Sequence, residues 1–222
     1  MNFSNTISIL LGIPKSIFIN FKYFPIKIAM RLPILVSKNT LIKGVNGKIT
    51  LPKNIKTGII RFGFGNIGIF DSERSKSIWQ VNGEAIFEGR ANIGHGSRLS
   101  INSNGKIKIG KNLDISAEST IICSNYISIG NDCLISWECL IMDTDFHYIK
   151  NENGEILNRD KAINIGNNVW IACRNTILKG SSISNNTVVA ANSTIYNEIK
   201  GENQIIGGNP CKILRNNTFW NK

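Results

Sequence analysis

The first seventy residues contain no acidic side chain. No Asp or Glu precedes Asp71, whereas residues 1–70 carry ten Lys or Arg. These cations account for almost the whole net charge of +11, because residues 71–222 are close to neutral. Such an asymmetry indicates that the N-terminal part meets an anionic partner.

Other features are also scarce or missing. The five cysteines form no C-x-x-C pair and no disulfide-like spacing, which favours a reducing cytoplasm. The N-terminus lacks a basic stretch followed by an apolar stretch and a cleavage site, so we expect no signal peptide. Apolar runs near that end are broken by Asn, Lys and Pro, and fall short of the roughly eighteen residues that a membrane span needs.

Three partners remain open for the basic segment. The stretch "IPKSIFINFKYFPIKIAMRLPIL" mixes large apolar residues with regularly spaced cations, as a segment at a membrane surface does. Residues 1–36 are therefore predicted to contact an anionic membrane at the cytoplasmic face of the inner membrane. The alternatives are docking on the protein itself with the lysines in solvent, and binding of nucleic acid, which we do not expect.

A six-residue repeat dominates the C-terminal half. In "IGNNVWIACRNTILKGSSISNNTVVAANSTI" an aliphatic residue occupies every sixth position, which neither a helix nor a half-buried strand explains. A fixed short repeat is typical of a solenoid, in which each unit is stable only when stacked on the next. Its aliphatic positions are predicted to point inward: Ile165, Ile171, Ile177, Ile183, Val189 and Ile195.

The repeat also suggests how the coils are closed. Three flat sides of about six residues give a triangular coil, with Gly or Asn in left-handed backbone conformations at the turns. Small residues, including Cys133 and Cys139, often stand two positions before the aliphatic one and are predicted to pack in the core. The spacing of the aliphatic positions is two residues longer than six between Ile121 and Ile129, and a polar stretch interrupts the repeat before Ile165.

The chain is predicted to have four parts. Residues 1–40 form a basic, partly helical segment interrupted by Pro14, Pro25 and Pro33. Residues 41–85 are a β-rich lead-in of short phrases punctuated by Gly and Asn. Residues 86–200 form the repeat domain with a loop at 148–162, and residues 201–222 form a C-terminal cap.

The repeat, together with "IGNNVWIACRNTILKG" and the closing "IIGGNPCKILR", resembles the hexapeptide-repeat acyltransferases. The resemblance covers residues 86–216 and implies a mainly β fold, a left-handed parallel β-helix. The left-handed sense rests on the resemblance alone, because strand-crossover rules favour a right-handed coil. More narrowly, the sequence is similar to acetyltransferases of polysaccharide biosynthesis, which use acetyl-CoA as co-substrate and no metal. The resemblance also implies a homotrimer with sites between neighbouring chains.

His147, just before the predicted loop, matches the catalytic histidine of this family. An imidazole suits the reaction, because a sugar hydroxyl must lose a proton as it attacks the thioester. Asp145 is predicted to orient that imidazole, with Asp143 as the competing orienter or a substrate contact. His95 is expected to be structural or solvent-facing, or else to contact substrate across a subunit boundary.

Donor-binding residues are carried over in the same way. Trp170 matches a family tryptophan near the donor, and its large side chain could equally cover a coil face. Ala172 and Ala191 match small residues beside the pantetheine arm. Lys212 and Arg215 are candidates for the CoA phosphates or for solvated surface. Where many relatives have Thr-Lys-Asp, this chain has "YNE" at 196–198, which puts one phosphate contact in doubt.

The predicted function is acetyl transfer from acetyl-CoA to a hydroxyl of a cell-surface polysaccharide or its lipid-linked precursor. N-acetylation of a nucleotide-linked amino sugar is the alternative within the class, and a non-catalytic structural β-helix is the alternative outside it. Zinc-dependent carbonic anhydrases share this fold but need three histidine ligands, and this chain has only two histidines.

Overall fold

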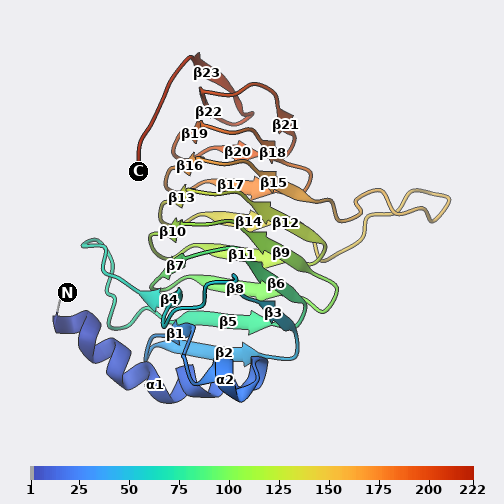
Figure 1. Ribbon diagram of the computed structural model, residues 1–222. Coiled ribbons are helices and arrows are strands. Elements are labelled where there is room, and N and C mark those ends of the chain that lie inside the picture. The colour runs from blue at the N-terminus through green and yellow to red at the C-terminus, as the bar shows by residue number, and fades with distance from the viewer. Residues whose placement is uncertain (1–2) are drawn as a thin grey trace.

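The computed structural model describes residues 3–222, which wind into a three-sided parallel β-helix with two helices at its N-terminal end (Figure 1). From β1 to β22 successive strands pass through three sheets in turn, so each sheet collects every third strand, and β23 then pairs antiparallel with β22. This confirms the predicted fold class, a left-handed parallel β-helix.

The three sheets are named A, B and C. Sheet A contains, in spatial order, β1 (Ile34–Val36), β4 (Ile60–Phe64), β7 (Ala91–Gly94), β10 (Leu113–Ile115), β13 (Leu134–Ile135), β16 (Trp170–Ile171), β19 (Thr187–Val189), β22 (Gln204–Gly207) and β23 (Lys212–Asn216). Sheet B contains β2 (Thr40–Gly44), β5 (Ser77–Val81), β8 (Arg98–Ile101), β11 (Thr120–Cys123), β14 (Leu140–Met142), β17 (Thr176–Leu178) and β20 (Thr194–Ile195). Sheet C contains β3 (Lys48–Thr50), β6 (Glu84–Phe87), β9 (Lys106–Ile109), β12 (Tyr126–Ile129), β15 (Ile163–Ile165), β18 (Ser182–Ile183) and β21 (Glu198–Ile199).

The aliphatic residues of the six-residue repeat form the core of the β-helix. All six aliphatic residues from Ile165 to Ile195 are buried, as predicted. Strand pairing stacks them coil upon coil, with Ile135 beside Ile171 and Ile171 beside Val189. Cys133 and Cys139 are buried in the same core, and burial raises the pKa of both thiols to about 11. They therefore serve packing, as expected.

Asparagine and glycine play different parts at the corners. Positive φ angles occur at Asn112, Asn168 and Asn186, as expected for left-handed turns. The glycines that follow the aliphatic positions do not have positive φ. A Cβ on Gly130 would lie 2.5 Å from the carbonyl oxygen of Gly166 in the next coil. These glycines are needed because the backbones of stacked coils approach closely there, which the sequence-based interpretation had not distinguished.

The N-terminal segment is more regular than predicted. Helix α1 (Phe3–Tyr23) continues through Pro14, whereas Pro25 separates it from the short α2 (Ile26–Ala29) and Pro33 precedes β1. Pro14 therefore does not interrupt the helix, because one missing backbone hydrogen bond is offset by the packing of α1 against the β-helix.

The coils also begin earlier than the hexads. Residues 34–50 already pair with the next coil, β1 with β4 and β2 with β5. The lead-in at 41–85 therefore has the same three-sided form, with longer turns that hide the beat in the sequence. The domain boundaries drawn at residues 40, 85 and 200 stay a prediction.

Candidate functional site

His147 lies at the corner where the chain passes from sheet B to sheet C. It follows β14 and begins the stretch that leaves the β-helix as the long loop in Figure 1. Its backbone N–H donates to the Asp145 carbonyl over 2.7 Å, and Phe146 takes a positive φ of 61°. This tight turn leaves the imidazole exposed, where a substrate can reach it.

Asp145 is held by two other side chains. Its Oδ2 accepts a hydrogen bond from Asn158 over 2.8 Å and another from the Lys179 ammonium. Lys179, and to a lesser extent Asn158, hold the pKa of the Asp145 carboxyl below its usual value. Its predicted role toward the imidazole stays a prediction, because the described bonds of the carboxylate are made to Lys179 and Asn158.

These contacts tie the two ends of the loop together. The Asn158 amide donates to the His147 carbonyl, and its Oδ1 accepts from the Ile149 N–H. Lys179 also donates to the Asn158 carbonyl over 2.6 Å. We call Asp145, Asn158 and Lys179 the loop clamp. It fixes the backbone on both sides of His147 and anchors it to β17.

Lys179 and Asn158 were not found from the sequence. Lys179 reaches the site because Met142 pairs with Leu178, which places the residues after β14 and β17 side by side. That register follows only once the length of the loop and the stacking of coils are known. No local motif marks either residue.

Asp143 has a structural position. Its carboxylate is fully buried, with one oxygen accepting from the Ser124 N–H over 2.7 Å and the other from the Asn125 N–H over 2.9 Å. It holds the turn between β11 and β12, next to the point where the hexads slip. Both carboxylate oxygens thus accept hydrogen bonds from backbone amides, and the predicted role of Asp143 as competing orienter or substrate contact stays a prediction.

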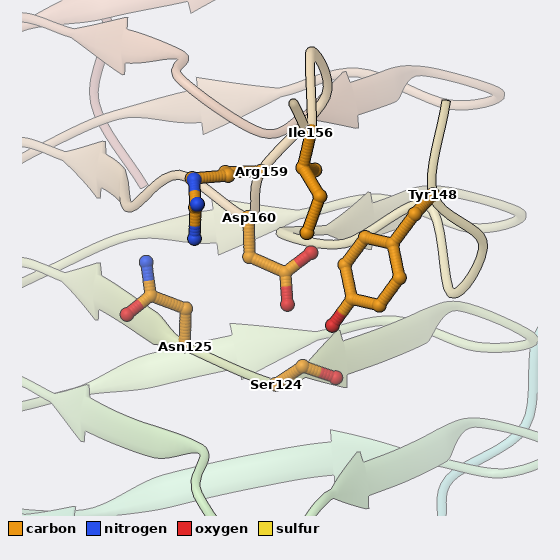
Figure 2. A pocket seen from close by; sticks show the side chains of 6 residues that line it. All are labelled: Ser124, Asn125, Tyr148, Ile156, Arg159 and Asp160. Carbon is orange, nitrogen blue, oxygen red and sulfur yellow. The ribbon is translucent and has the colours of Figure 1, made fainter. Parts of the chain in front are cut away.

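A polar pocket opens between this turn and the loop. Its volume is about 310 Å³. Figure 2 shows the Asp160 carboxylate and the Tyr148 ring facing the Ser124 hydroxyl across it, with Arg159 and Asn125 on the other side. Ile156 closes the loop side. Tyr148 is the neighbour of His147 in the chain, whereas His147 itself is not among the residues that line the pocket.

The predicted donor residues gather on sheet A. Trp170 pairs with Val188, Val188 with Ile205, and Ile205 with Arg215, which puts Trp170 and Arg215 in one register column. Four strands spaced by roughly 4.8 Å give the column a length of about 14 Å. Lys212 lies on the same outer strand, beside Gly207.

The Trp170 ring has two further contacts. Its Nε1 donates to the Ser136 hydroxyl over 3.2 Å. Trp220 packs against it from the C-terminal tail with ring centroids 5.8 Å apart, and itself donates to the Asn168 carbonyl. Sequence reasoning missed Trp220, because nothing in the pattern shows that the tail folds back along sheet A.

Ala172 and Ala191 lie one coil apart at the corner between sheets A and B. The Ala172 N–H already donates to the Val189 carbonyl, and its own carbonyl accepts from Asn175 Nδ2. What Ala172 offers a ligand is therefore its small side chain. Tyr196 and Asn197, by contrast, lie at the corner between sheets B and C, the same corner at which His147 lies.

His95 is far from both groups in the stacking order. It lies at an early corner between sheets A and B, is 2% exposed, and neither ring nitrogen has a hydrogen-bond partner within residues 3–222. Burial lowers the pKa of its imidazole, against the opposing effect of Glu118. Phe70 packs against the ring at 6.1 Å. Its predicted substrate contact stays a prediction.

The predicted base and the predicted donor residues thus lie on different sides of one chain. In a triangular coil the corner between sheets B and C is opposite sheet A, so His147 and Trp170 face away from each other. One β-helix does not bring them together. Two neighbouring β-helices can, when the corner of one meets a face of the other.

Comparisons with known proteins point to one class. The chain is 33% identical over 106 residues to the polysialic acid O-acetyltransferase of Neisseria meningitidis, which covers 47% of this chain and 49% of that protein. It is 32% identical over 111 residues to the galactoside O-acetyltransferase of Escherichia coli K12, with 49% and 53% covered. Over about half of its length the chain is thus similar to these two O-acetyltransferases. No family model matches it.

The chain spans about half the length of these two curated relatives. A broader match covers 84% of the chain and 83% of an uncharacterised 24.8 kDa protein in the cps region of Klebsiella pneumoniae, at 28% identity. Among solved structures, AntD, an N-acyltransferase from Bacillus cereus in complex with dTDP and coenzyme A, aligns with a TM-score of 0.51 over 82% of this chain and 80% of that one. At 15% identity this likeness shows the fold alone.

Proposed function

We propose that the protein transfers an acetyl group from acetyl-CoA to a sugar hydroxyl of a cell-surface polysaccharide or its precursor. The observation that carries this proposal is the exposed His147, whose backbone is fixed by the loop clamp and whose chain neighbour Tyr148 lines a polar pocket. The kinship with galactoside and polysialic acid O-acetyltransferases supports the reaction and the class of acceptor.

In the proposed reaction His147 acts as general base. One imidazole nitrogen takes the proton of the acceptor hydroxyl while its oxygen attacks the thioester carbonyl. The tetrahedral intermediate then collapses, the carbon–sulfur bond breaks, and the proton passes from the imidazolium to the leaving thiolate. The products are an acetyl ester and free coenzyme A, so atoms and charge balance.

The acceptor is proposed to bind in the pocket of Figure 2. The exposed Tyr148 ring offers a flat apolar surface for one face of a sugar, and Asp160 and Asn125 offer hydrogen bonds to its hydroxyls. Arg159 adds a cation that suits an acidic sugar. A sugar in this pocket would contact Tyr148, which follows His147 in the chain.

The site is proposed to be shared by two chains of a homotrimer. His147 of one chain would meet the Trp170–Arg215 column of its neighbour, because the two lie on opposite sides of one β-helix. When one surface of each chain binds a different surface of the next chain, the contacts can close into a ring. We propose that this ring contains three chains. The pantetheine arm would run along the column toward Lys212 and Arg215.

Transfer to an amine is the second candidate. It is supported by the fold shared with AntD, an N-acyltransferase in complex with dTDP and coenzyme A. The same general base would deprotonate an ammonium group.

The test is incubation of the purified chain with acetyl-CoA and a panel of neutral sugars, acidic sugars and amino sugars. We expect coenzyme A release and a product one acetyl mass heavier, which mild alkali removes from an ester but not from an amide. Tyr148→Ala should raise the KM for the acceptor severalfold and leave that for acetyl-CoA unchanged. No acetylated product with any acceptor would contradict the reaction, and an unchanged acceptor KM would contradict the pocket.

A further inference from the structure

Helix α1 leaves one of its faces uncovered. Its exposed apolar residues recur three, four or seven positions apart, so they form one stripe along the helix. Within the described part of the chain these residues are Leu10, Leu11, Pro14, Ile17, Phe18 and Phe21. Ile26 and Met30 extend the surface beyond Pro25, and Met30 is 71% exposed. We call this surface the N-terminal apolar face.

The opposite side of α1 is bound to the β-helix. Asn20 donates to the Ile34 carbonyl and accepts from the Ile34 N–H, and Ser16 accepts from the Val36 N–H. A Cβ at Gly12 would lie 2.1 Å from the Val36 carbonyl oxygen, so the helix sits tightly on β1. Docking on the protein itself, one of the alternatives drawn from the sequence, therefore uses this side and leaves the N-terminal apolar face free.

Cations border the face. Lys22, Lys27 and Arg31 are exposed, and none forms an ion pair with any residue in the described range 3–222. No acidic residue occurs among residues 1–70 to neutralise them. The pairing of large apolar side chains with unopposed cations is complementary to the surface of an anionic bilayer.

We infer that the N-terminal apolar face docks on the surface of an anionic membrane. Because α1 and α2 cover one end of the β-helix (Figure 1), docking through them leaves the long loop and strands β16 to β23 of sheet A accessible further along the rod. The large side chains insert among the lipid headgroups while the cations meet lipid phosphates. None of the described helices is long and apolar enough to span a bilayer. In a cell this places the enzyme at the cytoplasmic face of the inner membrane.

The experiment is co-sedimentation of the full chain with vesicles. One set is phosphatidylcholine alone, and the other is phosphatidylcholine mixed with phosphatidylglycerol. We expect binding to the mixed vesicles that weakens steeply with added salt, and little binding to the neutral ones. Phe18→Glu combined with Phe21→Glu should abolish binding, and Lys22→Glu combined with Lys27→Glu should weaken it at least tenfold.

Matched controls lie at the other end of the rod. Phe219→Glu and Lys200→Glu change an exposed phenylalanine and an exposed lysine there, and should leave binding unchanged. All variants should keep their thermal unfolding midpoint and their turnover of a soluble acceptor, which separates this inference from the proposed function. Equal binding to both kinds of vesicle, or binding that survives the paired Phe variants, would overturn it. So would reversible dimerisation that those variants abolish without any vesicle binding, since the face would then join two copies of the chain.

Discussion

At the scale of single residues, similar side chains have different roles according to burial. Asp143 and Asp145 are two positions apart, yet the first is buried on backbone amides and the second is exposed on Lys179 and Asn158. The difference arises because the chain turns out of the coil after Thr144, so regular strand alternation ends there. Because they are two positions apart, the sequence predicted the same side of a strand for both and did not distinguish their roles.

His147→Ala should lower kcat by the roughly 10²–10⁴-fold that general-base catalysis contributes. Asp145→Asn should cost less, because Asn158 still holds the His147 carbonyl. The measurement is steady-state release of coenzyme A, with calorimetric titration of acetyl-CoA to show that donor binding is kept. Native turnover by His147→Ala would contradict the assignment.

At the scale of elements, the long loop is held by few contacts. The antiparallel bridge between Lys150 and Ile156 lies within it, and the loop clamp joins its ends to β17. Loops with few buried contacts open locally more readily than the coils that carry them. The geometry around His147 therefore depends on Lys179.

Lys179→Met keeps the length of the side chain and removes its charge. We expect about a tenfold loss of kcat, equivalent to about 1.4 kcal/mol, because the loop no longer fixes the turn at His147. Amide hydrogen exchange should rise across 145–160 and stay unchanged in the coils. Lys179→Arg should recover part of the rate. A loss of kcat without faster exchange would indicate direct contact with substrate rather than positioning.

At the scale of the whole molecule, the separation of His147 from sheet A makes assembly part of the site. The sequence places all the candidate residues in one repeat domain, but the winding distributes them over different sides. A shared site makes a specific prediction for mixed assemblies.

His147→Ala and Trp170→Ala chains should each be poorly active alone. When they are unfolded, mixed in equal amounts and refolded together, about a quarter of the sites should regain both native residues, because each residue comes from a different chain. Coenzyme A release should recover to about that fraction, and light scattering should give the mass of a trimer. No recovery would show that one chain supplies both residues, and an active monomer would contradict the shared site.

The sequence by itself determined the coil. A strict period of six places one aliphatic residue inward on each flat side, and that local rule holds from Ile165 to Ile195 in the structure. It also pointed to His147, because this residue matches the catalytic histidine of the family that the sequence resembles and lies where the repeat is interrupted. The tertiary structure alone decided the loop clamp, the Trp170–Trp220 contact and the reason for the corner glycines. Each joins residues of different coils. The repeat predicts the shape of each coil, but it does not give the lengths of the loops between coils, and these lengths determine which residues meet. The free face of α1 was decided in the same way, because an amphipathic stretch does not state which of its sides the protein will cover.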